Sequence, residues 1–192
     1  MRVIPTDPEI RALHRAHAPS PESFEVVFTH CEIVWAIAEQ LLARCPEELD
    51  ADLVRAGCLL HDIGVYRLHG APYVRHGVLG HELLAEAGLP EPIRRFASCH
   101  TGVGLRRADI VAQDLPIPLG DYVAETGEEA LVMYADKFHT KSDPPRFLSA
   151  ATFAARIARF GADKVDLFDA MRLRFGEPDL TPLSDRYGHP VV

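Results

Sequence analysis

Residues 56–64 read AGCLLHDIG, an apolar run that ends in a histidine and an aspartate before the isoleucine and glycine. The run closes a stretch of helical character from Ala51 to Asp62, and Gly64 stands where a left-handed residue would end that helix. His61 and Asp62 are therefore expected at the mouth of a hydrophobic core. An unpaired buried charge is very costly, so both side chains need partners from elsewhere in the chain. The stretch predicts a helical core with a polar site at its edge.

The segments on both sides of this stretch also have helical patterns. Apolar residues recur at three- and four-residue steps, and proline or glycine separates the segments. The expected helices cover residues 7–17, 22–44, 51–62, 74–87, 90–99, 126–139, 146–159 and 161–175. Residues 101–124 are rich in glycine and proline, with one turn expected near 107–112, and loops of that length are often functional. No segment alternates as a strand does, so we predict an all-α fold, a single-domain helical bundle of about seven helices over residues 1–192.

The composition excludes several classes of protein. The chain has 20 basic and 28 acidic residues, which gives a net charge of −8. Non-specific binding to nucleic acid or to an anionic membrane requires a basic face, so this charge argues against both. The longest apolar run, 33–38, is far shorter than a membrane span. The N-terminal residues MRVIPTDPEI do not resemble a signal peptide, and the four cysteines form no CxxC motif. We therefore expect a cytoplasmic protein whose cysteines are reduced.

Four of the ten histidines and two aspartates form an ordered series on or at the ends of expected helices: His30, His61, Asp62, His76, His100 and Asp136. Imidazole and carboxylate groups together bind divalent zinc, iron, manganese, nickel or cobalt. Such a set can hold two ions if one carboxylate bridges them, and the pair can then hold a phosphoryl oxygen. A single histidine at the end of an apolar helix is, however, more often a core residue, and spacing alone does not join the six.

At residues 61–64, His-Asp-Ile-Gly, the sequence resembles the HD superfamily of metal-dependent phosphohydrolases, in the branch named for this motif. The other elements that resemble the family are 27–38 with His30, 53–64, 76–84 with His76, 96–104 with His100, and 128–137 with Asp136. The resemblance covers about residues 22–145. The Thr-Gly-Val-Gly step at 101–104 and the Leu-Pro segment at 115–116 resemble a small uncharacterised bacterial and archaeal subgroup.

The resemblance implies a helical bundle in which His30, His61, Asp62 and Asp136 surround one metal ion. It also implies that His76 and His100 complete a second metal site, which Asp62 bridges to the first. The implied cofactors are two divalent ions from among Fe, Mn, Co, Ni and Zn. The chain then divides into an HD metal-binding core at 22–145, C-terminal helices at 146–175 and a loosely held tail at 176–192.

The expected function is hydrolysis of a small phosphorylated substrate, a phosphomonoester or phosphodiester, by a metal-activated hydroxide. Asp62 and Lys137 are the expected catalytic residues, and Lys137 would stabilise charge on the phosphoryl oxygens. The alternative for Lys137 is a lysine on the surface of its helix. The side chains expected to bind the substrate are His69, Arg67, Arg75 and Arg106, of which the arginines match phosphate geometry.

Two rival functions use the same fold. Some HD proteins with the same ligands hold a mixed-valence di-iron pair and cleave a C–C or C–P bond with dioxygen. Iron with oxygen uptake would support that oxygenase, whereas anaerobic phosphate release would support the hydrolase, which we favour. A non-catalytic ligand-binding module is favoured less, because a degenerate member should have lost some of the six ligand positions.

The remaining histidines have no motif context. His81 is expected to support the site from outside or to lie at the surface, and the histidines expected at the surface are His14, His17, His139 and His189. The apolar face of residues 146–160 is expected to pack on the domain's own core, with a homodimer surface as the alternative. The expected partner is a small phosphorylated metabolite, and neither nucleic acid nor a membrane.

Overall fold

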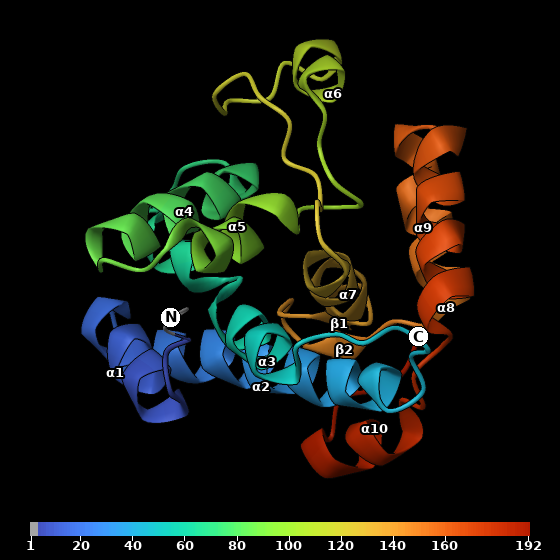
Figure 1. Cartoon of the computed structure of the whole chain (residues 1–192), viewed down its shortest axis with the longest axis horizontal. Coiled ribbons are helices and arrows are strands. Elements are labelled where there is room, and N and C mark those ends of the chain that lie inside the picture. The colour runs from blue at the N-terminus through green and yellow to red at the C-terminus, as the bar shows by residue number, and fades with distance from the viewer. Residues whose placement is uncertain (1–3) are drawn as a thin grey trace.

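The computed structural model describes residues 4–192, which form ten α-helices, three short 3-10 helices and one two-stranded sheet (Figure 1). The α-helices are α1 Asp7–His17, α2 Pro21–Leu42, α3 Ala51–Leu60, α4 His76–Glu86, α5 Glu91–Cys99, α6 Arg107–Ala112, α7 Gly127–Asp136, α8 Ala150–Ile157, α9 Ala162–Phe175 and α10 Thr181–Tyr187. The 3-10 helices are η1 Ile63–Arg67, η2 Tyr73–Arg75 and η3 Ala158–Phe160. The all-α expectation is confirmed. The turn expected near 107–112 is present as the short helix α6, and α10 is an additional helix in a segment without a clear helical period.

The helix α2 is the centre of the bundle, and α3 and α7 both pack against it (Figure 1). Two neighbouring stripes of α2 are apolar, so most of its circumference is buried. Val26 is an exception, because 55% of its surface is exposed although it belongs to the second stripe. Ser20 caps the helix by accepting a hydrogen bond from Ser23 N at 3.1 Å, and proline follows at the first turn.

Gly64 lies within η1 and follows the His61-Asp62 pair. The expected left-handed helix end at Gly64 is wrong, because the chain tightens into a 3-10 helix at this point. Glycine is needed for close packing instead: a Cβ at residue 64 would lie 2.0 Å from the backbone oxygen of His76 and 2.3 Å from Gly80 N. The helix η1 therefore lies directly against α4, and the start of α4 is held beside Asp62.

Residues 101–124 leave the bundle and return to it, with α6 at the far end (Figure 1). Backbone hydrogen bonds join the two arms of this excursion, because Leu105 N donates to Tyr122 O at 2.9 Å and Tyr122 N donates to Leu105 O at 2.7 Å. Lys164 Nζ, near the start of α9, lies 2.7 Å from Asp109 Oδ1 of α6. Only 5% of Lys164 is exposed, so a nearly buried ion pair fixes the excursion to the C-terminal helices.

The C-terminal part differs most from expectation. The helix expected from residue 146 begins at Ala150, because β2, Arg146–Phe147, pairs antiparallel with β1, His139–Thr140. The expectation of a loosely held tail is wrong. The segment contains α10, and Phe147 N donates to Pro190 O at 2.9 Å, so the end of the chain is bonded to β2.

The apolar face of residues 146–160 packs on the domain's own core, as expected. Phe147, Leu148 and Ile157 are buried, and Phe153 packs against the core cluster. Phe160 differs, because 44% of its surface is exposed.

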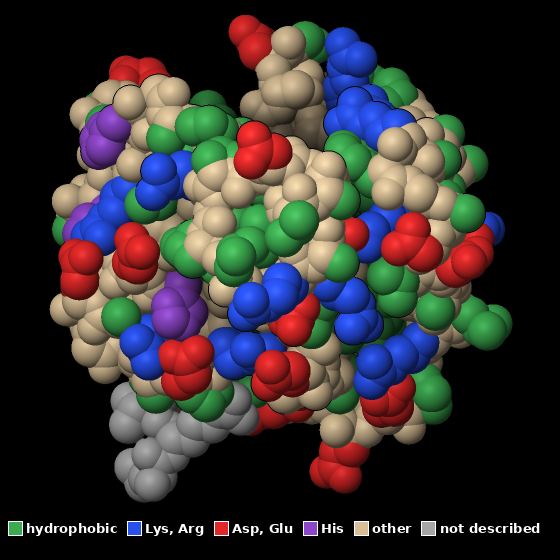
Figure 2. Space-filling model, turned by 90° about the horizontal axis from the view of Figure 1, so that it is seen from above, with side chains coloured by type: hydrophobic (Ala, Val, Ile, Leu, Met, Phe, Trp, Pro, Cys, Tyr) green, Lys and Arg blue, Asp and Glu red, His purple; other side chains and the backbone are tan. Residues whose placement is uncertain are grey.

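The surface seen in Figure 2 mixes both signs of charge. Lysine and arginine side chains lie among aspartate and glutamate side chains, with hydrophobic groups between them. Within residues 4–192, no helix is both long and apolar enough to cross a bilayer. The cysteines of this part are free thiols, and Cys31, Cys58 and Cys99 are buried as small core residues.

Candidate metal centre

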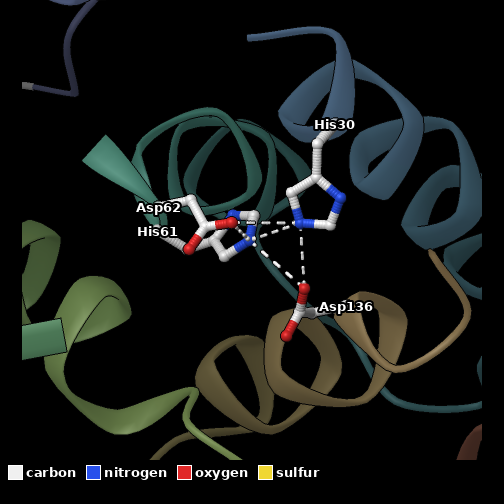
Figure 3. Close-up of side chains that lie close together, drawn as sticks. All are labelled: His30, His61, Asp62 and Asp136. Carbon is white, nitrogen blue, oxygen red and sulfur yellow. Dashed lines mark hydrogen bonds and ion pairs between the residues drawn. The ribbon is translucent and has the colours of Figure 1, made fainter. Parts of the chain in front are cut away.

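Four side chains from three helices converge in the first cluster, His30, His61, Asp62 and Asp136 (Figure 3). His30 comes from α2, His61 and Asp62 follow the last turn of α3, and Asp136 ends α7. His30 Nε2 lies 3.1 Å from Asp62 Oδ2 and 3.1 Å from Asp136 Oδ1. His61 Nε2 lies 3.3 Å from His30 Nε2 and 3.4 Å from Asp136 Oδ1. The fold thus gathers into one place residues that are more than 100 positions apart in sequence.

The second cluster is formed by Asp62, His76 and His100. His76 begins α4, and His100 follows the last residue of α5. Their Nε2 atoms lie 2.9 Å apart. Asp62 Oδ1 lies 3.5 Å from His76 Nε2 and 3.6 Å from His100 Nε2, so one carboxylate belongs to both clusters.

Backbone carbonyl groups fix the orientation of three of the imidazoles. The donor–acceptor pairs are His61 Nδ1 to Cys58 O at 2.7 Å, His76 Nδ1 to Tyr73 O at 2.6 Å, and His100 Nδ1 to Phe96 O at 3.0 Å. Because a carbonyl oxygen only accepts, each Nδ1 carries a hydrogen, and in the neutral ring Nε2 presents its lone pair to the cluster. An outer hydrogen bond of this kind is the usual support of a metal-ligating histidine.

Burial and neighbouring charges determine the ionisation of these groups. Burial lowers the pKa of His76 to about 4 and also lowers the pKa of His100, so both imidazoles are neutral near pH 7. Burial disfavours the charged form of Asp62, but Lys141 and His61 hold the pKa of Asp62 well below its usual value. The neutral imidazoles of His76 and His100 beside the ionised Asp62 are the protonation states that metal binding requires. Burial opposes the charge of His61, but Asp62 and Asp136 raise its pKa, so metal binding at the first cluster would displace a proton from His61.

The donor atoms fit divalent metal ions. Two nitrogens that are each about 2.1 Å from one ion lie roughly 3.0–3.4 Å apart at octahedral or tetrahedral angles. The Nε2 separations of 2.9 Å and 3.3 Å are close to that range. Asp62 Oδ1 is buried and has no hydrogen-bond partner within residues 4–192, which is costly for a carboxylate oxygen unless a cation satisfies it. The residues present therefore fit a divalent-metal centre.

A histidine expected at the surface instead supports His30. His139 of β1 is only 5% exposed, and its Nδ1 lies 2.8 Å from His30 Nδ1. Its Nε2 lies 3.0 Å from His189 Nδ1. Burial, with His30 and His189 nearby, lowers the pKa of His139 to about 2, so its ring is neutral. The surface expectation for His139 is wrong because the β1–β2 pairing, which has no local sequence signal, turns this side chain inward.

His14 is a second such correction. It is fully buried, with Nε2 2.7 Å from Leu59 O and Nδ1 3.0 Å from the hydroxyl of Tyr66. It lies one helical turn after the buried Ile10, and this i, i+4 spacing was the signal that could have found it. His81, in contrast, lies outside the clusters, with Nε2 3.0 Å from Glu91 Oε1.

Two lysines reach the clusters. Lys137 Nζ lies 2.6 Å from Asp136 Oδ2 and donates to His100 O at 2.8 Å, and the residue is only 6% exposed. The alternative of a surface lysine at this position is therefore wrong. Lys141 Nζ contacts Asp62 Oδ2, and Asp62 raises the pKa of Lys141 although burial opposes its charge. Sequence reasoning missed Lys141, which lies just after β1 and outside any motif.

A cavity of about 750 Å³ opens from the clusters toward α8 and α9. Asp62, His76 and Asp136 line its inner end, and Lys137 and Lys141 also line it. Two further cations, Arg156 and Arg159, line the same cavity and are exposed. These arginines were not among the expected substrate-binding residues.

The four expected substrate-binding residues do not line this cavity. Arg67 binds Glu86 through two hydrogen bonds, of 2.9 Å and 2.7 Å. His69 is exposed and has a positive φ of 42°, in the loop after η1. Arg75 and Arg106 are also exposed. Proximity to the motif in sequence therefore did not bring these side chains to the site.

Comparison with known proteins identifies the family. The fold is a helical bundle with two largely buried His/Asp clusters that could hold metal ions. The HD domain matches residues 27–141, which is more than half of the chain and includes every residue of both clusters. The chain belongs to the HD domain family.

Two relatives are similar over most of this core. An uncharacterised protein of Methanocaldococcus jannaschii is 39% identical over 122 residues, which cover 61% of this chain and 69% of that protein. A tRNA (cytidine(56)-2'-O)-methyltransferase of Picrophilus torridus is 35% identical over 117 residues, which cover 61% of this chain and 32% of the relative. The chain thus spans about a third of the length of that methyltransferase.

The fold is shared with solved structures of the HD domain of the phosphodiesterase PgpH from L. monocytogenes. The structure of that domain alone has a TM-score of 0.53 and covers 95% of this chain and 100% of its own. The complex with cyclic-di-AMP has a TM-score of 0.52 and covers 93% of this chain and 96% of its own. The sequences are 17% identical, so this likeness establishes the fold.

Proposed function

We propose that this protein is a metal-dependent phosphohydrolase that cleaves a phosphate ester of a small molecule at a binuclear His/Asp centre. The position of Asp62 carries the proposal. Its Oδ2 lies 3.1 Å from His30 Nε2 in the first cluster, and its Oδ1 lies 3.5 Å from His76 Nε2 in the second. A carboxylate shared in this way can bridge two ions, the arrangement that clamps a phosphoryl group.

The two clusters divide the ligands between the ions. The first ion would bind His30, His61, Asp62 and Asp136, and the second would bind Asp62, His76 and His100. Iron, manganese, cobalt, nickel and zinc all accept imidazole together with carboxylate. When bound, such a pair supplies a hydroxide nucleophile near neutral pH and polarises the phosphoryl group.

Lys137 and Lys141 would stabilise the negative charge on the phosphoryl oxygens. The hydrogen bond from Lys137 Nζ to His100 O, 2.8 Å long, holds one ammonium group at the inner end of the cavity. Lys141 Nζ contacts Asp62 and lines the same end. Fixed cations lower the barrier because the transition state of phosphoryl transfer spreads charge over these oxygens. Arg156 and Arg159 would add positive charge to the approach, which favours an anionic substrate although the net charge of the chain is −8.

The test is product release from a panel of phosphate esters under anaerobic conditions. The panel contains phosphomonoesters, nucleotides and cyclic dinucleotides, the last because a domain of the same fold binds cyclic-di-AMP. Each is assayed with protein loaded with Mn²⁺, Fe²⁺, Co²⁺, Ni²⁺ or Zn²⁺, and with protein treated with chelator. Asp62→Asn is the inactive variant, and His81→Ala is the matched control because His81 lies outside both clusters.

We expect wild type and His81→Ala to release product without oxygen, and Asp62→Asn and chelated protein to lose this activity. Unchanged activity of Asp62→Asn would overturn the proposal. Turnover that requires dioxygen would overturn it as well and would favour the oxygenase.

A further inference from the structure

The cavity in front of the clusters changes in character along its length. Its inner end is polar and charged, with Asp62, Asp136 and Lys137. Most of the remaining wall is apolar and includes Val103, Leu105, Leu115, Phe153, Ile157 and Phe160, although the arginines Arg156 and Arg159 also line it. A volume of about 750 Å³ is far larger than a phosphate group requires and lies in the range of sites for whole small-molecule ligands.

The apolar walls are held together by a specific contact. One wall belongs to the excursion at 101–115, and the other belongs to α8 and η3. The Lys164–Asp109 ion pair, with a distance of 2.7 Å, joins α9 to α6 across these two walls. Lys164 is 5% exposed, so this contact is shielded from solvent and retains more of its strength than a surface pair. The position of the two cavity walls is therefore determined by contacts within the fold.

Leu115 lines the cavity wall at a position that adds little to the hydrophobic core. Its side chain is half-buried and lines the cavity, yet within the described residues it is not part of the hydrophobic core cluster. An apolar side chain in this position gains little from the protein itself. It would gain more from an apolar ligand, which would remove its surface from water.

We propose that the substrate is an amphipathic phosphate ester, whose phosphate binds beside Lys137 at the metal centre of Asp62 and Asp136 and whose apolar body lies along Leu115, Phe153 and Ile157. This inference rests on the proposed phosphohydrolase function and adds the class of its leaving group. Sugar phosphates and other hydrophilic esters satisfy only the inner end of the cavity, and they leave the apolar walls in contact with water.

The test compares n-alkyl phosphates from ethyl to octyl, and glycerol phosphate, as substrates of the metal-loaded protein below their micellar concentrations. We expect kcat/KM to rise roughly twofold to fourfold for each methylene group that reaches the apolar wall, from the free energy of methylene burial. Binding of the matching non-hydrolysable alkylphosphonates is measured by calorimetry, and the heat-capacity change should become more negative with chain length.

Leu115→Gln is the test variant, and Leu119→Gln is its matched control. Leu119 lies in the same excursion, is 57% exposed and does not line the cavity. We expect Leu115→Gln to lower kcat/KM for octyl phosphate by roughly fivefold or more and to leave ethyl phosphate unchanged. Leu119→Gln should have the same kcat/KM as wild type for octyl phosphate and for ethyl phosphate.

The outcomes separate this inference from the proposed function. Hydrolysis of all these esters with no dependence on chain length, and equal binding of all phosphonates, would overturn the inference and leave the phosphohydrolase intact. Chain-length-dependent binding of phosphonates without hydrolysis of any ester would support the apolar subsite and overturn the phosphohydrolase.

Discussion

The Nε2 atoms of His76 and His100 lie 2.9 Å apart, and the Nδ1 of each ring is bonded to a backbone carbonyl oxygen. In neutral rings with this tautomer, neither Nε2 carries a hydrogen, so two lone pairs face each other. A shared cation removes that repulsion. The pair is therefore the most direct indication that a second ion belongs to the site.

Replacing either member of this pair should remove one ion and leave the other. We expect His76→Ala and His100→Ala to reduce the metal content from about two ions per chain to about one, because the first cluster does not use these side chains. His61→Ala should remove the first ion. Metal analysis of the purified, dialysed proteins measures this, with His81→Ala as the control. Equal metal content in His76→Ala and wild type would contradict a second site.

Lys141 should act on catalysis more than on folding. Lys141→Met should lower kcat/KM roughly 100-fold, because it removes a fixed positive charge beside the phosphoryl oxygens. Lys141→Arg should recover part of this loss. Arg67→Met serves as the control, because Arg67 binds Glu86 away from the cavity, and it should keep wild-type kinetics. The assignment fails if Lys141→Met and Arg67→Met have the same kcat/KM.

His14 should make stability depend on pH. Burial lowers its pKa from 6.5 to about 4, so the unfolded chain binds a proton at a higher pH than the folded protein does. The contribution of His14 to the free energy of unfolding is therefore complete above about pH 6.5. This contribution decreases by up to about 3 kcal/mol as the pH falls toward 4. Urea unfolding of wild type and His14→Gln between these pH values measures it. We expect a flatter pH dependence for the variant, and parallel curves would contradict this role.

Gly64 should be intolerant of any side chain. A Cβ there would lie 2.0 Å from His76 O and 2.3 Å from Gly80 N, both backbone atoms that cannot rotate away. We expect Gly64→Ala to lower the free energy of unfolding by about 3 kcal/mol or more. At Gly120 the nearest atom to an added Cβ is 3.7 Å away. Gly120→Ala should therefore change the free energy of unfolding by less than about 0.5 kcal/mol. Equal denaturation midpoints for the two variants would refute this packing argument.

The sequence allowed the central helices to be predicted because their patterns are local. The apolar period of α2 and the proline and glycine residues between helices indicate where each element begins and ends. The strand pair β1–β2 and the docked tail could not be predicted in the same way. Two-residue strands have no periodicity, and their pairing depends on Phe147 and Pro190 meeting across the fold.

The candidate site could be predicted where a motif marks it. The family resemblance predicts His30, His61, Asp62 and Asp136 as ligands of one ion, and the structure gathers these four residues into one cluster. His139 and Lys141 have no motif, because their place in the site comes from the turn of the chain after α7. The arginines near the motif in sequence do not line the cavity, whereas Arg156 and Arg159, which do line it, belong to α8 and η3.

Anomalous X-ray scattering from crystals grown with Mn²⁺ tests whether the chain holds a binuclear centre. We predict two anomalous peaks, one in contact with His30, His61 and Asp136 and one in contact with His76 and His100, with Asp62 between them. A map with fewer than two peaks beside Asp62 would contradict a binuclear centre.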